Sequence, residues 1–379
     1  MSTTETPAAA LKETPLASIH RERGAKMVPF AGWSMPLHYG SIVEEHHQVR
    51  RSGGLFDVSH MGRLMFTGKD ARAFLDHVCT RQVLGMEDGQ ARYGIVCNER
   101  GGCRDDVLVY RMGESEYMMV CNASNREKLL GHFAQVKEAR GFVFKLEDFT
   151  ERSVMVAIQG PKVMGVLADF SSSIPGLKRY RFLKKELFGL EMIVSRTGYT
   201  GEDGVEVIFR TDGFIAQTAM KMLVSKLDGR EEIALAGLGA RDSLRLEASM
   251  ALYGHEIEED VDPLSAGLRF AVKLDKGEDA GRFIGQDALE RIDAEGPKRR
   301  LVGLRLEGRR AARQGAVVAA GDAEVGTVTS GCLSPTLEQS IAMAFVDAAH
   351  ATDGTTLAVR FGRGDVAATV VPMPFYKPA

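Results

Sequence analysis

The chain has 379 residues, of which 44% are hydrophobic and 26% are charged, and its formal net charge is -3. This composition is typical of a globular protein and excludes a disordered, collagenous or coiled-coil chain. At ~150 residues per domain, the length predicts two or three domains. A near-neutral chain has no overall field to hold nucleic acid or an anionic membrane, so we expect neither as a partner.

Residues 1–14 are polar and rich in Ala, Thr and Pro, which predicts a disordered lead. No basic stretch followed by an apolar stretch marks a signal peptide, and no run of ~18 apolar residues could span a membrane. The five cysteines are few and odd in number, which favours a reducing compartment over a disulfide framework. Cys97 and Cys103 lie farther apart than common metal-ligand pairs. We therefore expect a cytoplasmic protein without a metal site.

The first clear helix signal is Ser41-Ile-Val-Glu44, a capping box in which the serine hydroxyl accepts from the Glu44 amide. The helix is expected to end at Arg50-Arg51, whose cations suit the C-terminal dipole, before the glycines that follow. A strand is expected over residues 56–66, and amphipathic helices are expected over 71–79 and 125–139.

The stretch between the two later helices predicts a three-stranded meander, over residues 93–98, 103–111 and 117–122. Its first turn is rich in glycine, which can adopt positive φ. If Tyr110 faces Tyr117, antiparallel pairing places Asp105 opposite Asn122. The sequence therefore predicts a carboxylate and an amide side by side on one face of the sheet.

The pattern changes after AEGPKRR (residues 294–300), where Gly-Pro and a charged run interrupt the chain. Downstream, short β-branched runs are separated by Gly, Asp and Ser, which is typical of an all-β barrel or sandwich. Upstream, helix and strand patterns are mixed. We therefore expect a mixed α and β region over residues 15–293 and a separate β domain over residues 298–379.

Several long strings stand out: FAGWSMPLHYGSIVEEHHQVRRSGGLFDVSHMG (30–62), YGIVCNERGGCRDDVLVY (93–110), SRTGYTGEDGVEV (195–207), GLGARDSLRLEASMALYGHEI (237–257) and GTVTSGCLSPTLEQSIAMAFV (326–346). Together they resemble one family, the glycine cleavage system T-protein or aminomethyltransferase family. The resemblance covers about residues 15 to 376. It implies an α+β fold, a three-lobed cloverleaf around a folate channel, with a C-terminal all-β barrel domain. The region 15–293 would then form two interleaved lobes.

The resemblance also implies an activity. The one-carbon unit of an aminomethyl-lipoyl group on H-protein would pass to tetrahydrofolate, giving 5,10-methylenetetrahydrofolate, ammonia and dihydrolipoyl H-protein. The implied partners are lipoylated H-protein and tetrahydrofolate, with functional association with glycine decarboxylase and dihydrolipoyl dehydrogenase.

For catalysis, the resemblance points to Asp105, in the string GGCRDD. N10 of the folate is a weak arylamine nucleophile, and a carboxylate beside it can accept its N–H and stabilise developing positive charge. Asp106 points to the other side of its strand and is expected to be structural or solvated. The chain departs from the family pattern at Cys103-Arg104, where aliphatic or small residues are usual.

For folate binding, the resemblance points to Glu206 and Arg241. A carboxylate is the natural bidentate acceptor for two adjacent donors on the edge of a pterin, and an arginine fork suits carbonyl or carboxylate oxygens. Glu202 competes with Glu206, but its glycine-flanked position favours a role in the loop. The remaining expected folate contacts are Tyr199, Asn122, Met61 and Tyr93.

The anionic glutamyl tail of a folate must leave the channel towards cations, and Arg360 and Arg363 are candidates. Basic clusters at residues 178–181, 184–185 and 298–300 are candidate docking patches for H-protein, although a charge run is more often a solvated face. His60 is expected to be a satisfied structural histidine rather than an acid or base.

Two alternatives stay open. The first is another folate-dependent enzyme on the same scaffold, such as a demethylase; these are typically fused to an oxidase domain with a dinucleotide motif, which this sequence lacks. The second is a non-catalytic folate-binding relative in iron–sulfur assembly. That branch carries a Lys-Gly-Cys string, whereas the comparable stretch here, residues 252–256, has no cysteine.

Overall fold

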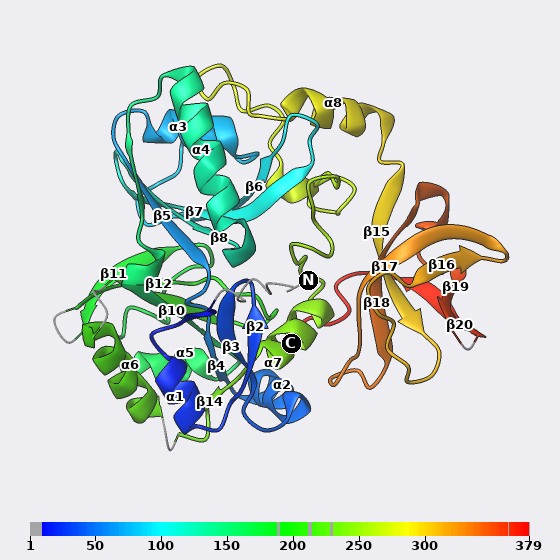
Figure 1. Ribbon diagram of the computed structural model, residues 1–379, viewed down its shortest axis with the longest axis horizontal. Coiled ribbons are helices and arrows are strands. Elements are labelled where there is room, and N and C mark those ends of the chain that lie inside the picture. Colours follow the sequence, from blue (N-terminus) through cyan, green and yellow to red (C-terminus); the bar gives the residue numbers. More distant parts are fainter. Residues whose placement is uncertain (1–9, 188–189, 211–213, 228–229, 363, 379) are drawn as a thin grey trace, which may run out of the picture.

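The computed structural model describes residues 10–187, 190–210, 214–227, 230–362 and 364–378. Its strands form a three-stranded sheet, a six-stranded sheet, a five-stranded sheet and a closed barrel. Figure 1 shows the barrel at one side of a larger body that holds the three sheets. The α+β fold and the C-terminal β-barrel expected from the sequence are confirmed. None of the helices in the described ranges is long and apolar enough to cross a membrane.

A small sheet begins the described chain, with the strand order β1-β3-β2. Its strands and the helix between them are β1 (Lys12–Glu13), α1 (Ala17–Glu22), β2 (Lys26–Phe30) and β3 (Trp33–His38). β1 belongs to the segment 1–14 that we expected to be disordered, and residues 1–9 of that segment lie outside the described part of the chain. Lys12 and Glu13 are ordered because they pair with β3.

The six-stranded sheet has the order β11-β12-β13-β10-β4-β14. Its strands are β4 (Gly54–Asp57), β10 (Ser153–Gln159), β11 (Phe182–Leu187), β12 (Leu190–Ser195), β13 (Gly204–Arg210) and β14 (Ala234–Leu235). One face packs through an apolar core on α1, α5 (Val163–Ala168) and α6 (Phe214–Leu227). On the other face, α2 (Ile42–Arg51) and α7 (Leu238–Glu247) contribute Val49 and Leu244 to a second core. Ser41 caps α2 as expected and accepts from the Glu44 amide at 3.3 Å.

The five-stranded sheet has the order β6-β7-β8-β5-β9. Its strands are β5 (Gly62–Thr67), β6 (Ala91–Cys97), β7 (Cys103–Gly113), β8 (Glu116–Cys121) and β9 (Lys145–Asp148). The helices α3 (Ala71–Val78) and α4 (Arg126–Arg140) cover one face, where the rings of Phe66, Phe74 and Phe133 pack together. The other face contributes Tyr110 and Met118 to the second core of the six-stranded sheet. The two large sheets therefore face each other, and the expected meander β6-β7-β8 is confirmed.

One strand prediction is wrong. The single strand expected over residues 56–66 is two strands, β4 and β5, which belong to different sheets. Residues 58–61 turn between them, and the Met61 amide closes the turn on the Val58 carbonyl at 3.1 Å. This turn passes from one large sheet to the other, so it lies where the two sheets meet.

The expected register of the meander is wrong by one residue. Tyr110 pairs with Met118 rather than with Tyr117, because the pairing shifts between Arg111 and Gly113 at the end of the hairpin. A β-bulge of this kind adds one residue to one strand and displaces the pairing beyond it.

The C-terminal barrel closes in the order β15-β18-β17-β16-β19-β20. Helix α8 (Gln286–Glu295) leads into its strands β15 (Arg299–Leu306), β16 (Val317–Ala320), β17 (Ala323–Leu333), β18 (Ser340–Asp347), β19 (Thr356–Phe361) and β20 (Gly364–Val371). After β20 the chain returns to the larger body and ends near α7 (Figure 1). There the Tyr376 amide donates to the Glu247 carbonyl at 2.8 Å, and the Tyr376 ring centre lies 4.0 Å from the guanidinium carbon of Arg50. The C-terminal segment thus fastens the barrel to the body.

Candidate active site

Asp105 and Asp106 are adjacent on β7 and point to opposite faces of the five-stranded sheet. Asp105 is fully buried, on the face where Val107 packs with α3 and α4. Its carboxylate accepts from the Asn122 amide at 3.0 Å, from Asn122 Nδ2 at 2.8 Å and from Asn125 Nδ2 at 2.6 Å. Asp105 and Asn122 are therefore in contact, although the expected register that placed them directly opposite each other is wrong by one residue. These donors belong to the junction of β8 and α4, so Asp105 holds that junction in place.

Asp106 faces the six-stranded sheet, as do Leu108 and Tyr110 further along β7. Its carboxylate accepts from the Tyr93 hydroxyl at 3.0 Å and from Asn122 Nδ2 at 2.7 Å. Asn122 thus bridges the two carboxylates. Two residues expected to contact folate, Tyr93 and Asn122, meet at Asp106.

Burial raises the pKa of both aspartates above the usual range. For Asp105, the negative charge of Asp106 adds to the effect of burial, while the amide donors of Asn125 and Asn122 oppose it. The pair therefore retains a proton more readily than an exposed aspartate does. A carboxyl pair with this property can hold or accept a proton at a bound substrate.

The facing sheet contributes Glu206, on β13. Its side chain is buried and lies on the same face of the strand as Ile208, which packs in the core between the sheets. One carboxylate oxygen accepts from the Thr197 hydroxyl. Burial raises the pKa of Glu206, and this effect is opposed by the Thr197 hydrogen bond and the charge of Arg241. Glu206 therefore has a buried carboxylate with acceptor capacity to spare.

Arg241 lies on α7, with its guanidinium carbon 4.7 Å from the centre of the Tyr199 ring. Its Nη1 atom is buried and has no hydrogen-bond partner within the described residues. The Tyr199 hydroxyl donates to the Ala251 carbonyl at 2.5 Å, which holds the ring in position. A buried donor without an acceptor is costly and rare in folded proteins. A bound ligand or a water molecule would supply the acceptor that this nitrogen needs.

Together, Glu206 and Arg241 fit a flat polar ring. Glu206 offers an acceptor and Arg241 offers a donor, and each shifts the pKa of the other through its charge. The Tyr199 ring beside them offers a stacking surface. A flat ring with adjacent donors on one edge and a carbonyl oxygen on another would satisfy both residues at once.

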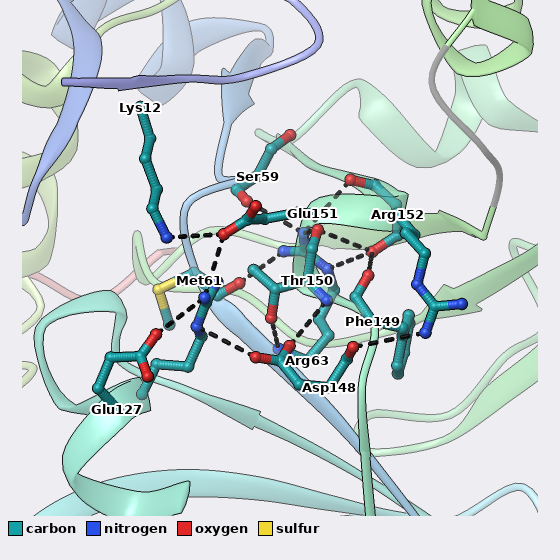
Figure 2. Close-up of polar contacts among 12 residues, drawn as sticks. Lys12, Ser59, Met61, Arg63, Glu127, Asp148, Phe149, Thr150, Glu151 and Arg152 are labelled. Atoms are coloured by element: carbon teal, nitrogen blue, oxygen red, sulfur yellow. Dashed lines mark hydrogen bonds and ion pairs between the residues drawn. The ribbon is translucent and has the colours of Figure 1, made fainter. Parts of the chain in front are cut away.

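Met61 lies in the turn between β4 and β5, and the fully buried Arg63 holds that turn. Its guanidinium donates to the carbonyls of Met61 at 2.7 Å and Ser59 at 3.0 Å, and to the Ser153 hydroxyl at 2.8 Å. Figure 2 shows Arg63 at the centre of this cluster, with residues 148–152 on its other side. Burial lowers the pKa of Arg63 to about 10. The arginine fixes the backbone that carries Met61, whose side chain packs against the core between the sheets.

His60 differs from the satisfied structural histidine that we expected. The residue is 3% exposed, and its Nδ1 atom has no hydrogen-bond partner in the part of the chain that the structure describes. Burial lowers the pKa of His60 to about 3, so the ring is neutral near pH 7. The expectation is therefore wrong for Nδ1, which remains available to a ligand.

Glu202, the competitor of Glu206, serves its loop as expected. Its carboxylate accepts from Arg50 Nη1 at 2.9 Å, and the same arginine donates to Glu247 through Nε at 3.0 Å. Arg50 also donates to the Thr200 carbonyl at 2.7 Å. The loop that carries Tyr199 is thus fastened to α2 and α7.

Sequence reasoning missed one aromatic residue beside the site. Phe270, in the 3-10 helix η3 (Arg269–Ala271), is 61% exposed, and its ring stacks on Tyr93 with 5.9 Å between centroids and 20° between planes. Phe270 stands in a short apolar run, which reads as ordinary core. Its exposure and its contact with Tyr93 follow only from the packing of η3 on β6.

The five cysteines are unpaired, and four of them are buried. Burial raises the pKa of the Cys79 thiol to about 12. Within the described ranges, no group of three or more His, Cys, Asp or Glu side chains could hold a metal ion.

The fold is defined by two facing sheets with buried polar side chains between them and by a closed barrel fastened to them. Residues 16–276 match the family described as the GCVT N-terminal domain. Residues 299–377 match the glycine cleavage T-protein C-terminal barrel domain. The chain belongs to the glycine cleavage T-protein family.

Full-length relatives agree with this assignment. An aminomethyltransferase of Rubrobacter xylanophilus is 46% identical over 368 residues, covering 97% of this chain and 95% of the relative. One of Streptomyces coelicolor is 43% identical and covers 100% of this chain and 99% of the relative. The crystal structure of glycine cleavage system aminomethyltransferase T from Bartonella henselae has a TM-score of 0.87 and 33% identity, covering 97% of this chain and 99% of that one. The chain is therefore an enzyme of the aminomethyltransferase type.

Proposed function

We propose that the chain transfers the one-carbon unit of the aminomethyl-lipoyl group on H-protein to tetrahydrofolate. The products are 5,10-methylenetetrahydrofolate, ammonia and dihydrolipoyl H-protein. Full-length similarity to aminomethyltransferases supports the reaction. The folate half rests on one observation: Arg241 Nη1 is buried and has no hydrogen-bond partner among the described residues, while Glu206 lies near enough to shift the pKa of Arg241. A pterin satisfies both groups at once.

Each of the expected contact residues binds a different part of the folate. Glu206 accepts from the donor edge of the pterin, Arg241 donates to its oxygen, and Tyr199 stacks on or bonds the ring. Met61 and Tyr93 line the apolar part of the site. Asn122 lies beyond them at the aspartate pair.

The catalytic carboxylate was expected at Asp105, but the contacts favour Asp106. Asp106 shares its sheet face with Tyr93 and looks toward the sheet that carries Glu206. Asp105 points to the helix-covered face, where its acceptors are occupied by Asn122 and Asn125. We therefore assign Asp106 to the folate and treat Asp105 as a positioning residue that holds Asn122 against Asp106.

The reaction explains why a carboxylate with a raised pKa is useful. N10 must attack an iminium-like carbon, and it loses its proton as the new N–C bond forms. A carboxylate at hydrogen-bond distance aligns the lone pair, stabilises the developing charge and accepts that proton. Burial raises the pKa of Asp106, which brings its proton affinity closer to the working pH.

Family membership supports H-protein and folate as partners. We propose lipoylated H-protein as the carrier of the substrate, with functional association with glycine decarboxylase and dihydrolipoyl dehydrogenase, in the cytoplasm. Similarity to the Bartonella henselae glycine cleavage protein supports the association.

A donor comparison tests the proposal against its alternatives. The purified chain is incubated with tetrahydrofolate and, in turn, aminomethyl-loaded H-protein, or sarcosine or dimethylglycine with an electron acceptor. We expect methylenetetrahydrofolate and ammonia in equal amounts with the H-protein donor alone. Product from the methylated amines would support a demethylase instead. Saturable tetrahydrofolate binding without product from any donor would support a non-catalytic relative.

A further inference from the structure

A cavity opens at the end of the C-terminal barrel where β15 and β19 stop. It has a volume of about 600 Å³, and among the described residues it is lined by 310–311, 313–316 and 360–362. None of these residues belongs to the site between the two large sheets. Three of the described lining residues are arginines, and none is acidic. Pockets for small ligands usually enclose about 300–1,000 Å³, so the cavity is large enough for one.

The loop between β15 and β16, which carries two of these arginines, is fixed at several points. The Ser340 hydroxyl donates to the Arg310 carbonyl at 2.7 Å. Ala312 is fully buried in the core of the barrel. Gln314 Nε2 donates to the Gly254 carbonyl at 2.7 Å, which ties the loop to the larger body. The arginines of the loop therefore extend from a backbone that is held on both sides.

The guanidinium of Arg310 is also held in place, because its central carbon lies 4.2 Å from the centre of the Phe361 ring. A cation over the face of an aromatic ring is attracted to it, and this contact uses none of the N–H groups. Among the described residues, neither Arg310 nor Arg313 forms an ion pair with a carboxylate or donates a side-chain hydrogen bond. All five N–H donors of each guanidinium are therefore left for other partners.

Arg360, the third arginine of the cavity, already has partners. It pairs with Glu324 at 2.9 Å, and its Nη2 atom donates to the Asp322 carbonyl at 2.7 Å. Of the two tail residues expected from the sequence, Arg360 is thus paired, and Arg363 lies outside the described residues. The cavity therefore keeps the charges of the two loop arginines without a counter-ion in the described part of the chain.

The walls of the cavity combine two kinds of chemistry. Arg310 and Arg313 offer planar forks of donors, which match the oxygens of a phosphate group. Phe361, Ala311 and Ala316 add apolar surface beside them. The face of the Arg310 guanidinium that is turned away from Phe361 can stack on a flat ring. A lone phosphate would leave most of this space unfilled, whereas a nucleotide carries both an anionic group and a flat base.

We propose that this cavity binds a nucleoside di- or triphosphate. The phosphates lie on Arg310 and Arg313, and the base lies against the plane of the Arg310 guanidinium. The proposal goes beyond the transfer reaction and does not depend on it, because the cavity shares no residue with the site between the sheets.

The test is titration calorimetry of the full chain with ATP, adenosine and inorganic triphosphate in metal-free buffer. We expect saturable ATP binding that weakens as salt rises, weaker binding of triphosphate, which cannot stack, and no binding of adenosine. Arg310→Gln/Arg313→Gln should raise Kd for ATP about 100-fold. The matched control is Arg300→Gln/Arg305→Gln, which removes two exposed charges from β15 of the same barrel and should leave Kd nearly unchanged. Thermal unfolding checks that both variants are folded.

Four results would overturn the proposal. The first is an original chain that does not bind ATP. The second is an equal loss of ATP affinity in the control, because general surface charge would then explain the binding. The third is inorganic triphosphate bound as tightly as ATP, which would make the cavity a simple anion site. The fourth is a raised KM for H-protein in Arg310→Gln/Arg313→Gln with unchanged ATP affinity, because the arginines would then serve an acidic protein surface.

Discussion

The Tyr93 hydroxyl donates to the Asp106 carboxylate at 3.0 Å across two neighbouring strands. A second donor, Asn122 Nδ2, reaches the same carboxylate at 2.7 Å. Two donors, one from β6 and one from the segment after β8, fix the orientation of Asp106 and leave its other lone pairs free to accept further hydrogen bonds. The Tyr93 ring also stacks on Phe270, so one residue connects the carboxylate to an exposed aromatic ring.

Tyr93→Phe should shift the pH dependence of catalysis. The Tyr93 hydrogen bond lowers the pKa of Asp106 against the effect of burial, so its loss should raise that pKa. The acid limb of the kcat profile should therefore move to higher pH. The profile is measured from pH 5 to 9 with saturating substrates. An unshifted acid limb, with the variant folded, would remove Tyr93 from the control of Asp106.

Arg241→Met should weaken folate binding without unfolding the protein. The guanidinium has one buried nitrogen with no partner in the described chain, so it adds little to the stability of the free enzyme. We expect Kd for tetrahydrofolate to rise about 10- to 100-fold, while the melting temperature changes little. Titration calorimetry and thermal unfolding measure the two effects.

The matched control is Arg245→Met, one turn further along α7. Arg245 pairs with Asp242 at 2.8 Å and with the buried Glu256 at 2.9 Å. Its loss leaves the Glu256 charge buried and should cost about 3–5 kcal/mol of stability. Unchanged folate affinity in Arg241→Met would exclude Arg241 from the site.

Arg63→Met should lower the free energy of unfolding by about 3 kcal/mol or more, because several buried acceptors lose their donor together. Arg63→Lys should lose less stability than Arg63→Met, because the lysine ammonium can still donate to some of these acceptors. Urea unfolding measures the free energy of unfolding of both variants. Lys12→Met serves as the control, since Lys12 and its partner Glu151 are about half exposed (49% and 55%) and their pair should contribute less than about 1 kcal/mol. A variant of Arg63 as stable as the control would contradict its role in the turn of Met61.

Asp57→Asn should change acid stability. Burial alone would raise the pKa of Asp57, but hydrogen bonds from His20, Ser59 and Thr14, with the charge of His20, lower it to about 2. A carboxyl group with a lowered pKa stabilises the fold above its unfolded value near ~4, and that stabilisation is lost as pH falls towards the folded value. The shift corresponds to about 2 kcal/mol. Between pH 5 and pH 2, the free energy of unfolding should fall less steeply in Asp57→Asn than in the original chain. The same slope in both proteins would contradict a lowered pKa at Asp57.

Local patterns predicted much of the fold because they act over short distances. The capping box of Ser41, the alternation in the meander and the β-branched runs of the barrel each produced the expected element. The turn at residues 58–61 was missed because Val58 to Met61 contains neither glycine nor proline and continues a strand-like pattern. The shift between Arg111 and Gly113 was missed because bulges leave no simple signal in the sequence. The domain boundary at 293–298 remains a prediction.

The site was less predictable, because tertiary packing decides which residues face one another. The alternation of side chains along a strand predicted that Asp105 and Asp106 lie on opposite faces of the sheet, and they do so in the structure. Which face meets the other sheet depends on where α3 and α4 pack, and no pattern within β7 reports that. Glu206 and Arg241 were named through family resemblance, whereas the unpaired nitrogen of Arg241 is visible only in the folded chain.

The central claim is that Asp106 acts on the folate and that Asp105 holds Asn122. The most direct measurement is the single-turnover rate of methylenetetrahydrofolate formation in Asp106→Asn and Asp105→Asn, with tetrahydrofolate Kd and melting temperature recorded for both. Asp106→Asn should lower the rate by ~10² to 10⁴ while folate still binds. Asp105→Asn should lower the melting temperature, because an amide cannot accept all the hydrogen bonds from Asn122 and Asn125, and it should lower the rate less. Full activity in Asp106→Asn, with the large loss in Asp105→Asn instead, would contradict the account.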